Sequence, residues 1–337
     1  MLTYVIRRLI QLPFLLLLVS ALVFFVLRLG PSPVDMATEA VRDPKEVERI
    51  RQAWGLDRPI YVQYVDYVLR AARGDFGRSF LSNVPVSRVI AERYPATLEL
   101  ALLGMALGAV IGISLGVLSA VRANTWVDTL ARTFALTWIS LPVFWVGLMA
   151  MAVLAVQLEW LPVGGRFNAR TPIDTVTGFY LLDGLLSRDR EVVQTALRHM
   201  AMPTVVIGLA TAGFIARITR ATVLEGLRED YIRTARAKGL RERTVILGHG
   251  FRNALLPIVT LMGLQFGTLL GGAAVTETVF AWPGLGKLMV DAISVRDFPQ
   301  VQASVLLLAV TYVVINLFVD LLYVLIDPRI RYGPSAG

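Results

Sequence analysis

Six long apolar runs constrain the fold of this chain more than any other feature of its sequence. An α-helix of about 20 apolar residues crosses the ~30 Å hydrocarbon core of a bilayer. Runs of this kind occur at residues 9–27, 98–121, 134–158, 202–218, 255–275 and 301–326. They predict an all-α polytopic membrane protein with six transmembrane helices.

The composition agrees with this fold class. Asp, Glu, Lys and Arg make up 17% of the residues, against roughly 25% in an average soluble domain. The chain contains no cysteine, which excludes disulfides, thiolate metal sites and cysteine nucleophiles. Its formal net charge is +8. In a soluble chain that charge would suggest nucleic acid, whereas in a membrane protein it first suggests cytoplasmic loops.

Hydrophilic stretches divide the chain into four parts. The first apolar run has no small-residue cleavage site behind it, so residues 1–29 are predicted to form a retained signal-anchor helix. Residues 30–97 mix nearly balanced charges with aromatic residues and are predicted to form a small extracytoplasmic segment. Residues 98–327 hold the five further spans, and residues 328–337 form a cytoplasmic tail. Within the core, the pattern allows a short apolar helix around residues 179–186.

Positive charge in the short connections predicts the orientation, because long loops cross the membrane largely regardless of their charge. Residues 217–252 carry nine Lys and Arg residues against four acidic ones. This loop is therefore predicted to be cytoplasmic, and with six spans both termini lie on the same side. The topology accounts for the excess positive charge, so no nucleic-acid partner is expected.

Glycines recur at every fourth position in two of the spans. Such a stripe leaves one helix face without side chains, so that another helix backbone can approach closely in lipid. The spacing leaves open whether each stripe packs within the chain or meets a partner subunit. The two stripes consist of Gly104, Gly108, Gly112 and Gly116 in the second span, and of Gly263, Gly267 and Gly271 in the fifth.

Polar residues in the spans are candidates for a solute pathway or for structural contacts. Asn316 and Asp320 share one helix face, where structural hydrogen bonding near the cytoplasmic end is preferred over contact with a solute. Glu277 and Phe280 lie at the outer end of the fifth span, where a pathway or gating role and a structural role are equally open. Gln265 is the third candidate pathway residue, although an interhelical hydrogen bond explains it most simply.

Motifs for chemistry are missing from the sequence. There is no G-x-x-x-x-G-K-[ST] phosphate loop, so the chain is not its own P-loop motor. There is also no H-E-x-x-H or G-x-S-x-G motif. The two histidines, His199 and His249, fall on opposite sides of the membrane in the predicted topology, so no metal site and no catalytic dyad is expected.

The basic loop has the pattern of a short helix, a turn and a returning helix. Asp230 is a plausible N-cap, residues 231–238 are compatible with a helix, and Gly239 is placed to end it. Residues 241–255 can form the second helix. A purely solvated loop would not need an apolar side, so we expect another protein to cover the side formed by Tyr231, Ile232, Ala235 and Leu240.

This loop resembles the cytoplasmic loop of permease subunits in ATP-binding-cassette importers, in the form used by the peptide and nickel branch. That form is similar to A-R-A-x-G followed by H-x-x-R-N-A-x-x-P. The chain departs from the general importer motif, which begins Glu-Ala-Ala, with Arg233 and Thr234 at the first two positions. The matching residues are Ala235, Arg236, Ala237, Gly239, His249, Arg252, Asn253, Ala254 and Pro257.

The likeness extends over nearly the whole chain. Before the second span it includes the patterns W-G-L-D-R-P from Trp54, G-D-F-G from Gly74 and R-Y-P-A-T from Arg93. After the fifth span it includes E-T-V-F from Glu277 and P-G-L-G from Pro283. The order and spacing of these patterns together resemble those of peptide permease subunits.

The resemblance implies a type I importer permease fold in the cytoplasmic membrane of a bacterium or archaeon. It implies a homologous second permease, two cytoplasmic ATPase subunits and an extracytoplasmic solute-binding protein as partners. ATP and magnesium would be bound by the ATPases, with no cofactor in this chain. The loop 217–253 would couple the ATPase to the spans through Asp230, Tyr231, Arg233, Thr234, Ala235, Arg236, Ala237, Lys238, Gly239, His249, Asn253 and Pro257.

Several alternatives remain open at this point. Permeases for nickel chelates, glutathione and oligosaccharides share these motifs with peptide permeases. A secondary transporter driven by an ion gradient is a different class, against which the lack of midplane carboxylates argues. An intramembrane enzyme would need a pair of polar residues at one depth, and the sequence predicts none.

Overall fold

A computed structural model describes residues 2–30, 34, 44–167 and 176–326. The predicted tail at residues 328–337 lies outside these described residues. The described chain is helical, and its β-structure is limited to one isolated bridge between Arg78 and Pro85.

Five helices are long and apolar enough to cross a membrane. They are α1 (Leu2–Leu29), α5 (Val86–Val121), α9 (Arg190–Gly226), α12 (Arg252–Val279) and α14 (Phe298–Ile326). The second of them begins earlier than predicted, because residues 86–97 form the first turns of α5 rather than part of the hydrophilic segment.

The third predicted span, 134–158, is wrong as a single straight helix. The chain forms α6 (Trp126–Ser140), then α7 (Val143–Ala150), which continues as the π-helix η1 (Met151–Gln157). The two parts are bent by 97° at the break. Leu141 is extended there, because the ring of Pro142 disfavours a helical conformation for the residue before it. Counted as one broken span, the pair brings the total to six.

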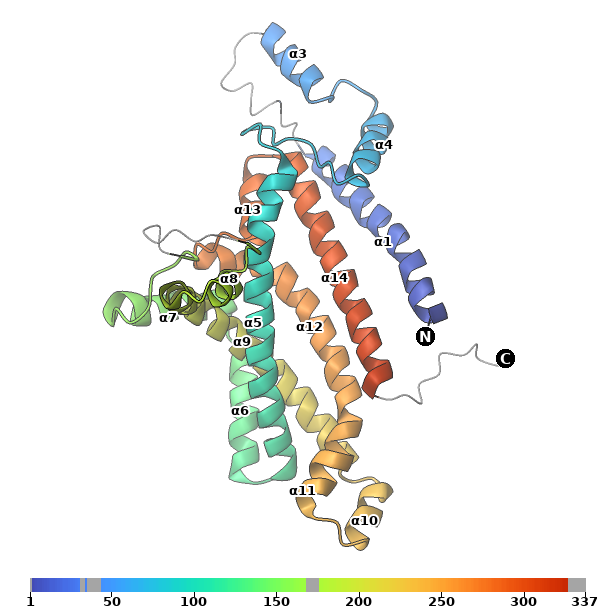
Figure 1. The fold of residues 1–337 in the computed structure, drawn as a ribbon, viewed down its shortest axis with the longest axis vertical. Helices are drawn as coiled ribbons and strands as arrows, with labels where there is room; N and C mark the ends of the chain where they lie inside the picture. The colour runs from blue at the N-terminus through green and yellow to red at the C-terminus, as the bar shows by residue number, and fades with distance from the viewer. Residues whose placement is uncertain (1, 31–33, 35–43, 168–175, 327–337) are drawn as a thin grey trace.

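Short helices lie at both ends of the bundle (Figure 1). At one end, α3 (Pro44–Ala53) and α4 (Ile60–Ala71) follow α1. At the opposite end, α10 (Asp230–Ala237) and α11 (Glu242–Thr244) connect α9 to the π-helix η2 (Val245–Phe251) and α12.

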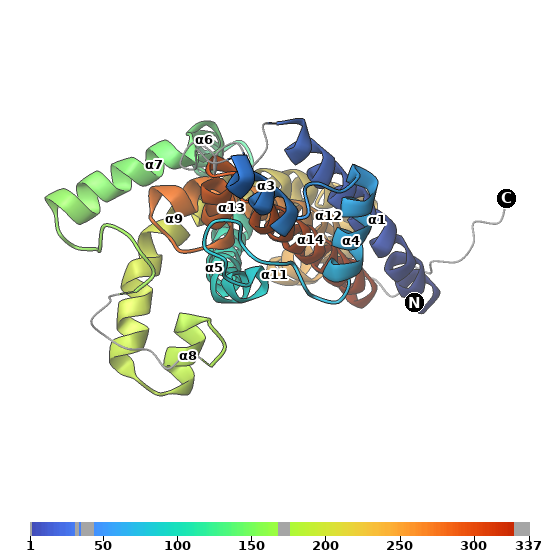
Figure 2. The same ribbon diagram turned by 90° about the horizontal axis from the view of Figure 1, so that it is seen from above.

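Two further short helices precede α9 and α14 in the chain. The predicted short apolar helix is confirmed as α8 (Tyr180–Leu186), and α13 (Leu285–Ser294) precedes α14. Seen from above, α7 and α8 extend on the side of the bundle opposite α1 (Figure 2).

The centre of the bundle is the pair α5 and α9, which contact each other along most of their length. The glycine stripe of α5 faces α9. A Cβ atom added to Gly108, Gly112 or Gly116 would lie 2.8 Å or less from Thr211, Ile215 or Thr219 respectively. Gly104 has the same relation to Ile207. The first stripe therefore packs within the chain, and the absence of side chains lets the two helices approach closely.

The second stripe has mixed surroundings. Gly263 of α12 faces Val319 of α14, and Gly267 faces the ring of Tyr312. Gly271 has no atom within 4 Å of the position that its Cβ would occupy. Within this stripe, the end nearer to α13 is therefore open.

Candidate functional site

The predicted helix of the basic loop exists as α10. Gly239 ends it with φ +75°, a conformation that glycine adopts without steric cost, and its N–H donates to the carbonyl of Arg236 at 2.9 Å. The prediction of Asp230 as the N-cap is wrong. Glu229 holds the cap position with extended backbone, and Asp230, the first residue of the helix, pairs with Arg233 at 3.2 Å.

The returning helix is continuous with the fifth span. The segment Glu242–Val279 forms a single helical stretch of 38 residues. His249 lies in η2, and Asn253 and Pro257 lie in the first turns of α12. Pro257 has no N–H to donate to the carbonyl of Asn253, which weakens the helix locally. Residues 238–241 form the turn that joins α10 to this helical stretch.

The apolar side of α10 is partly covered by the chain itself, which corrects the expectation that another protein covers all of it. Ile232 and Ala235 are buried against Val245 and Leu227. The reason is that α10 folds back on η2, which could not be inferred from the spacing of residues within α10. Tyr231 and Leu240 remain exposed.

Most of the predicted coupling residues in the loop have exposed side chains. An ion pair between Arg236 and Glu242, with a nitrogen-to-oxygen distance of 2.6 Å, joins α10 to α11. Leu247 of η2 is another exposed large apolar side chain of the loop. The predicted coupling residues that are exposed are Asp230, Tyr231, Arg233, Thr234, Arg236, Ala237, Lys238 and Gly239 in or next to α10, and His249, Asn253 and Pro257 in η2 and α12.

A buried ion pair near the same end of the bundle was missed by sequence reasoning. Asp128 is fully buried at the start of α6, and Arg220 of α9 binds both of its oxygens, at 2.7 and 2.9 Å. The hydroxyl of Ser119 and the backbone N–H of Asn124 donate to the same carboxylate, at 2.6 and 2.9 Å. These bonds tie the turn between α5 and α6 to α9, six residues before α9 ends.

Glu277 lies in the packed interior at the opposite end. Its carboxylate accepts hydrogen bonds from the Thr97 hydroxyl at 2.6 Å and the Lys287 N–H at 2.7 Å. The indole N–H of Trp282 donates to the carbonyl of Ala96 at 2.9 Å. Gly284 lies so close to the carboxylate that a Cβ would collide with it. These contacts give Glu277 a structural role in holding the segment after α12 against α5.

The other two candidate pathway residues differ in burial. Phe280 is buried and packs beside Gly147 of α7. Gln265 is half-buried on α12. A pathway role for these two residues stays a prediction.

A second buried ion pair joins α5 to the segment before α8. The guanidinium of Arg166 pairs with Glu99, donates to the carbonyl of Gly178 at 2.6 Å and lies 3.9 Å from the ring centre of Tyr180. Glu99 also accepts the N–H of Leu181 at 2.9 Å. Sequence reasoning missed this pair, because the two residues are 67 positions apart and have no shared spacing signal.

Asp183 stabilises the turn that leads into α8. Its carboxylate accepts hydrogen bonds from the Thr177 hydroxyl at 2.6 Å and from the backbone N–H groups of Thr177 and Gly178 at 2.9 and 3.0 Å. Burial works to raise the pKa of Asp183, but these hydrogen bonds outweigh it and lower the pKa below its ordinary value.

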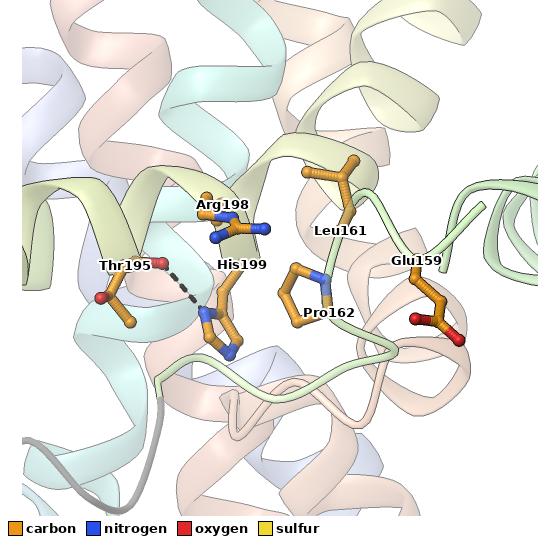
Figure 3. Close-up of a pocket in the computed structure, with 6 residues that line it drawn as sticks. All are labelled: Glu159, Leu161, Pro162, Thr195, Arg198 and His199. Atoms are coloured by element: carbon orange, nitrogen blue, oxygen red, sulfur yellow. Dashed lines mark hydrogen bonds between the residues drawn. The ribbon is translucent and has the colours of Figure 1, made fainter. Parts of the chain in front are cut away.

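A cavity of about 310 Å³ lies between the segment after η1 and the first turns of α9 (Figure 3). Glu159, Pro162 and Arg198 contribute to its lining. His199 lines it as well, and its Nδ1 lies 2.9 Å from the carbonyl of Thr195. His199 lies near the start of α9, whereas His249 lies in η2, beyond the other end of α9. Among the described residues, no three His, Asp or Glu side chains are grouped as metal ligands would be.

A larger cavity of about 490 Å³ lies between α1, α12 and α14. Asn316 and Asp320 both line it, as expected for residues that share one helix face. Asn316 donates to the carbonyl of Tyr312 at 3.1 Å. Across the cavity wall, the Tyr323 hydroxyl donates to Thr260 at 2.6 Å, which joins α14 to α12.

Comparison with known families covers almost the entire chain. A family model described as a binding-protein-dependent transport system inner membrane component matches residues 112–332. A model of the N-terminal part of such membrane components matches residues 1–101.

Curated relatives match at full length. The dipeptide transport system permease protein DppB of Alkalihalophilus pseudofirmus is 40% identical over 98% of this chain and 100% of its own length. The di/tripeptide transport system permease protein DppB of Pseudomonas aeruginosa is 43% identical over 98% of this chain and 99% of its own. The glutathione transport system permease protein GsiC of Escherichia coli K12 is 42% identical over 98% of this chain and 100% of its own.

The bundle of apolar spans with a basic helical loop at one end is the architecture of a polytopic membrane protein. The chain belongs to the family of binding-protein-dependent transport system inner membrane components. It is a permease subunit of an ATP-driven importer, in the branch to which the peptide permeases belong.

Proposed function

We propose that this permease subunit forms half of the pathway through which short peptides enter the cell. The observation that carries the proposal is the full-length similarity, at 40 to 43% identity, to permeases named for dipeptides, di/tripeptides and glutathione. All three solutes are short peptides. Nickel chelates and oligosaccharides are the alternative solutes within the branch.

A homologous second permease completes the pathway in this proposal. An extracytoplasmic solute-binding protein delivers the peptide at the end of the bundle that carries α3 and α4. Two cytoplasmic ATPase subunits bind ATP and magnesium, and one of them receives α10. The termini of the chain lie in the cytoplasm, and this chain itself performs no hydrolysis.

Transport then follows from a two-state equilibrium that is biased from both ends. Closure of the ATPase pair moves α10, which is supported by the exposure of Tyr231, Leu240 and Leu247 in the loop that contains it. The continuous helix Glu242–Val279 carries this movement to α12. The Asp128–Arg220 ion pair carries it from α9 to the turn between α5 and α6. The spans tilt, and the pathway opens outward to the loaded binding protein.

Uptake by the reconstituted complex tests the proposal. Proteoliposomes that contain both permeases and the ATPases, with ATP inside and the loaded binding protein outside, are expected to accumulate radiolabelled dipeptide. Omission of internal ATP is the control and should abolish the accumulation. Accumulation of a nickel chelate or an oligosaccharide in place of peptides would overturn the assignment of the solute. Uptake that survives without ATP and stops with an uncoupler would instead indicate a secondary transporter.

A further inference from the structure

Helix α4 has two apolar faces, and α1 covers one of them. On the covered face, the rings of Tyr64 and Tyr67 pack against Phe24, with ring centres 5.1 and 5.9 Å apart. On the other face, Tyr61, Val65 and Leu69 follow each other at intervals of four residues and are 68, 53 and 54% exposed. Such a stripe makes the helix amphipathic, with an apolar face that α1 does not cover.

Contacts with α1 place α4 beside the apolar span, with the Tyr64 hydroxyl reaching toward the middle of that span. The Tyr64 hydroxyl donates to the carbonyl of Leu17 at 3.1 Å and lies 3.1 Å from the Ser20 hydroxyl. Both partners belong to the apolar span Ile10–Leu29. Leu17 lies about 18 Å along the helix axis from the end of that span, at 1.5 Å per residue. Tyr64 therefore reaches well below the level at which α1 leaves the hydrocarbon.

One polar group of α4 is bonded to the end of that span. Gln63 accepts two hydrogen bonds, at 3.2 and 2.9 Å, from Arg28, which ends the apolar run of α1. Arg58 and Asp66 form an exposed ion pair at 3.0 Å. Tyrosines are enriched at membrane interfaces, because the ring is apolar and the hydroxyl polar. The three tyrosines of α4 follow this pattern.

The span that α4 packs against also has exposed apolar side chains. Leu18, Leu22 and Val26 of α1 are exposed, within a span that is long and apolar enough to cross a membrane. Figures 1 and 2 both show α4 beside the outer end of α1. Exposed apolar side chains are therefore present on both α1 and the α4 that packs against it.

We propose that α4 is an interfacial helix, with the stripe of Tyr61, Val65 and Leu69 seated among the phospholipid acyl chains of the outer leaflet. The arrangement is that of a monotopic amphipathic helix, lying in the interface with its apolar face down. The segment after α4 is in turn bonded to the residue that precedes α14. Ser79 donates to the carboxylate of Asp297, before α14, and the N–H of Phe80 donates to the same group at 3.2 Å.

Lipid-depth quenching tests this inference, and the absence of cysteine from the chain makes it direct. Single cysteines are introduced as Val65→Cys and Leu69→Cys and labelled with a small fluorophore. The permease is assembled with its partner subunits, made free of cysteine, in phosphatidylcholine nanodiscs. Leu22→Cys on α1 serves as the control in lipid, and Arg88→Cys on α5, where the side chain is 75% exposed, as the control in water.

The labels at residues 65 and 69 are expected to be quenched by a lipid with a nitroxide near the top of its acyl chain, to within about twofold of the Leu22 control. Iodide in the buffer should quench the Arg88 control and leave both α4 labels unaffected. Quenching of the α4 labels by iodide would overturn the inference, since the stripe would then face water. Protection from both quenchers would also overturn it, since a protein partner would then cover the stripe. Neither result depends on which solute is transported.

Discussion

Asp128 and Arg220 form a bidentate ion pair across 92 positions of sequence, with nitrogen-to-oxygen distances of 2.7 and 2.9 Å. The carboxylate is fully buried, and the guanidinium lies on α9 near the point where α9 leads into α10. Any movement that α10 imposes on α9 must therefore move the turn between α5 and α6 or break this pair.

Removing one member of this pair is expected to destabilise the subunit. In Asp128→Asn the guanidinium loses its ionised partner, and breaking a buried pair in this way costs about 3–5 kcal/mol. The partial exposure of Arg220 places the expected loss at the low end of that range. The measurement is the free energy of unfolding in detergent, from denaturant titration followed by circular dichroism. Arg132→Gln is the control, because Arg132 touches the same carboxylate at 3.4 Å but is half exposed.

The double variant separates the pair from its surroundings. Asp128→Asn combined with Arg220→Gln is expected to be less destabilised than the sum of the two single variants, by about 1–3 kcal/mol. Strict additivity would show that the two side chains do not stabilise the fold through each other.

The glycine stripe of α5 provides a matched comparison with that of α12. In Gly116→Ala the new methyl group would lie 2.5 Å from the Cβ of Thr219 and 2.7 Å from the carbonyl of Ala216, so α5 and α9 must separate. Overpacking of this kind costs about 1–3 kcal/mol. Gly271→Ala meets no atom within 4 Å and is expected to leave the stability of the isolated subunit unchanged. The midpoint of thermal aggregation in detergent measures both. Equal midpoints would contradict the intramolecular packing.

Gly271→Ala could instead lower the stability only after the subunit has assembled with its partner permease, which would indicate a contact between the two subunits. That result would place this open end of the second stripe against the partner permease, since among the described residues no side chain or other helix lies within 4 Å of the position that a Cβ on Gly271 would occupy.

The surface around α10 can be tested without disturbing the fold. Leu240→Asp changes an exposed side chain, and burial of a leucine at an interface contributes about 1.5 kcal/mol, or roughly tenfold in affinity. The variant is expected to assemble less tightly with the ATPase, and stimulation of ATP hydrolysis by the loaded binding protein should fall about tenfold. Leu186→Asp at the opposite end of the bundle is the matched control. Unchanged stimulation in Leu240→Asp would argue against docking at this surface.

Removing Arg166 alone is expected to destabilise the protein more than removing both charges of the Arg166–Glu99 pair. Arg166→Met leaves a buried carboxylate without its cation, which costs about 3–5 kcal/mol, whereas Arg166→Met with Glu99→Gln removes both charges and should recover most of the loss. Release of the segment before α8 is measured by the rate of limited proteolysis. Equal cleavage rates for the single and the double variant would show that the charge pairing does not hold the segment.

Much of the architecture could be predicted because a bilayer imposes simple rules on length and composition. The apolar runs located five spans directly, and the turn at Gly239 followed from the conformational freedom of glycine. The break at Pro142 could have been anticipated from the restriction that proline places on the residue before it. The break was not predicted because this proline lies within a long apolar run, which was interpreted as one straight span.

The sequence by itself determined that the chain is a helical membrane protein with a basic loop on one side, because hydrophobic length and local charge act through neighbouring residues. The tertiary structure decided the partners of the buried groups. The pairing of Asp128 with Arg220, the burial of Ile232 and Ala235 under η2, and the enclosure of Glu277 by the segment after α12 all depend on which helices meet. Pairing across distant segments leaves no periodic trace in a single sequence, so these contacts became visible when the helices were placed side by side.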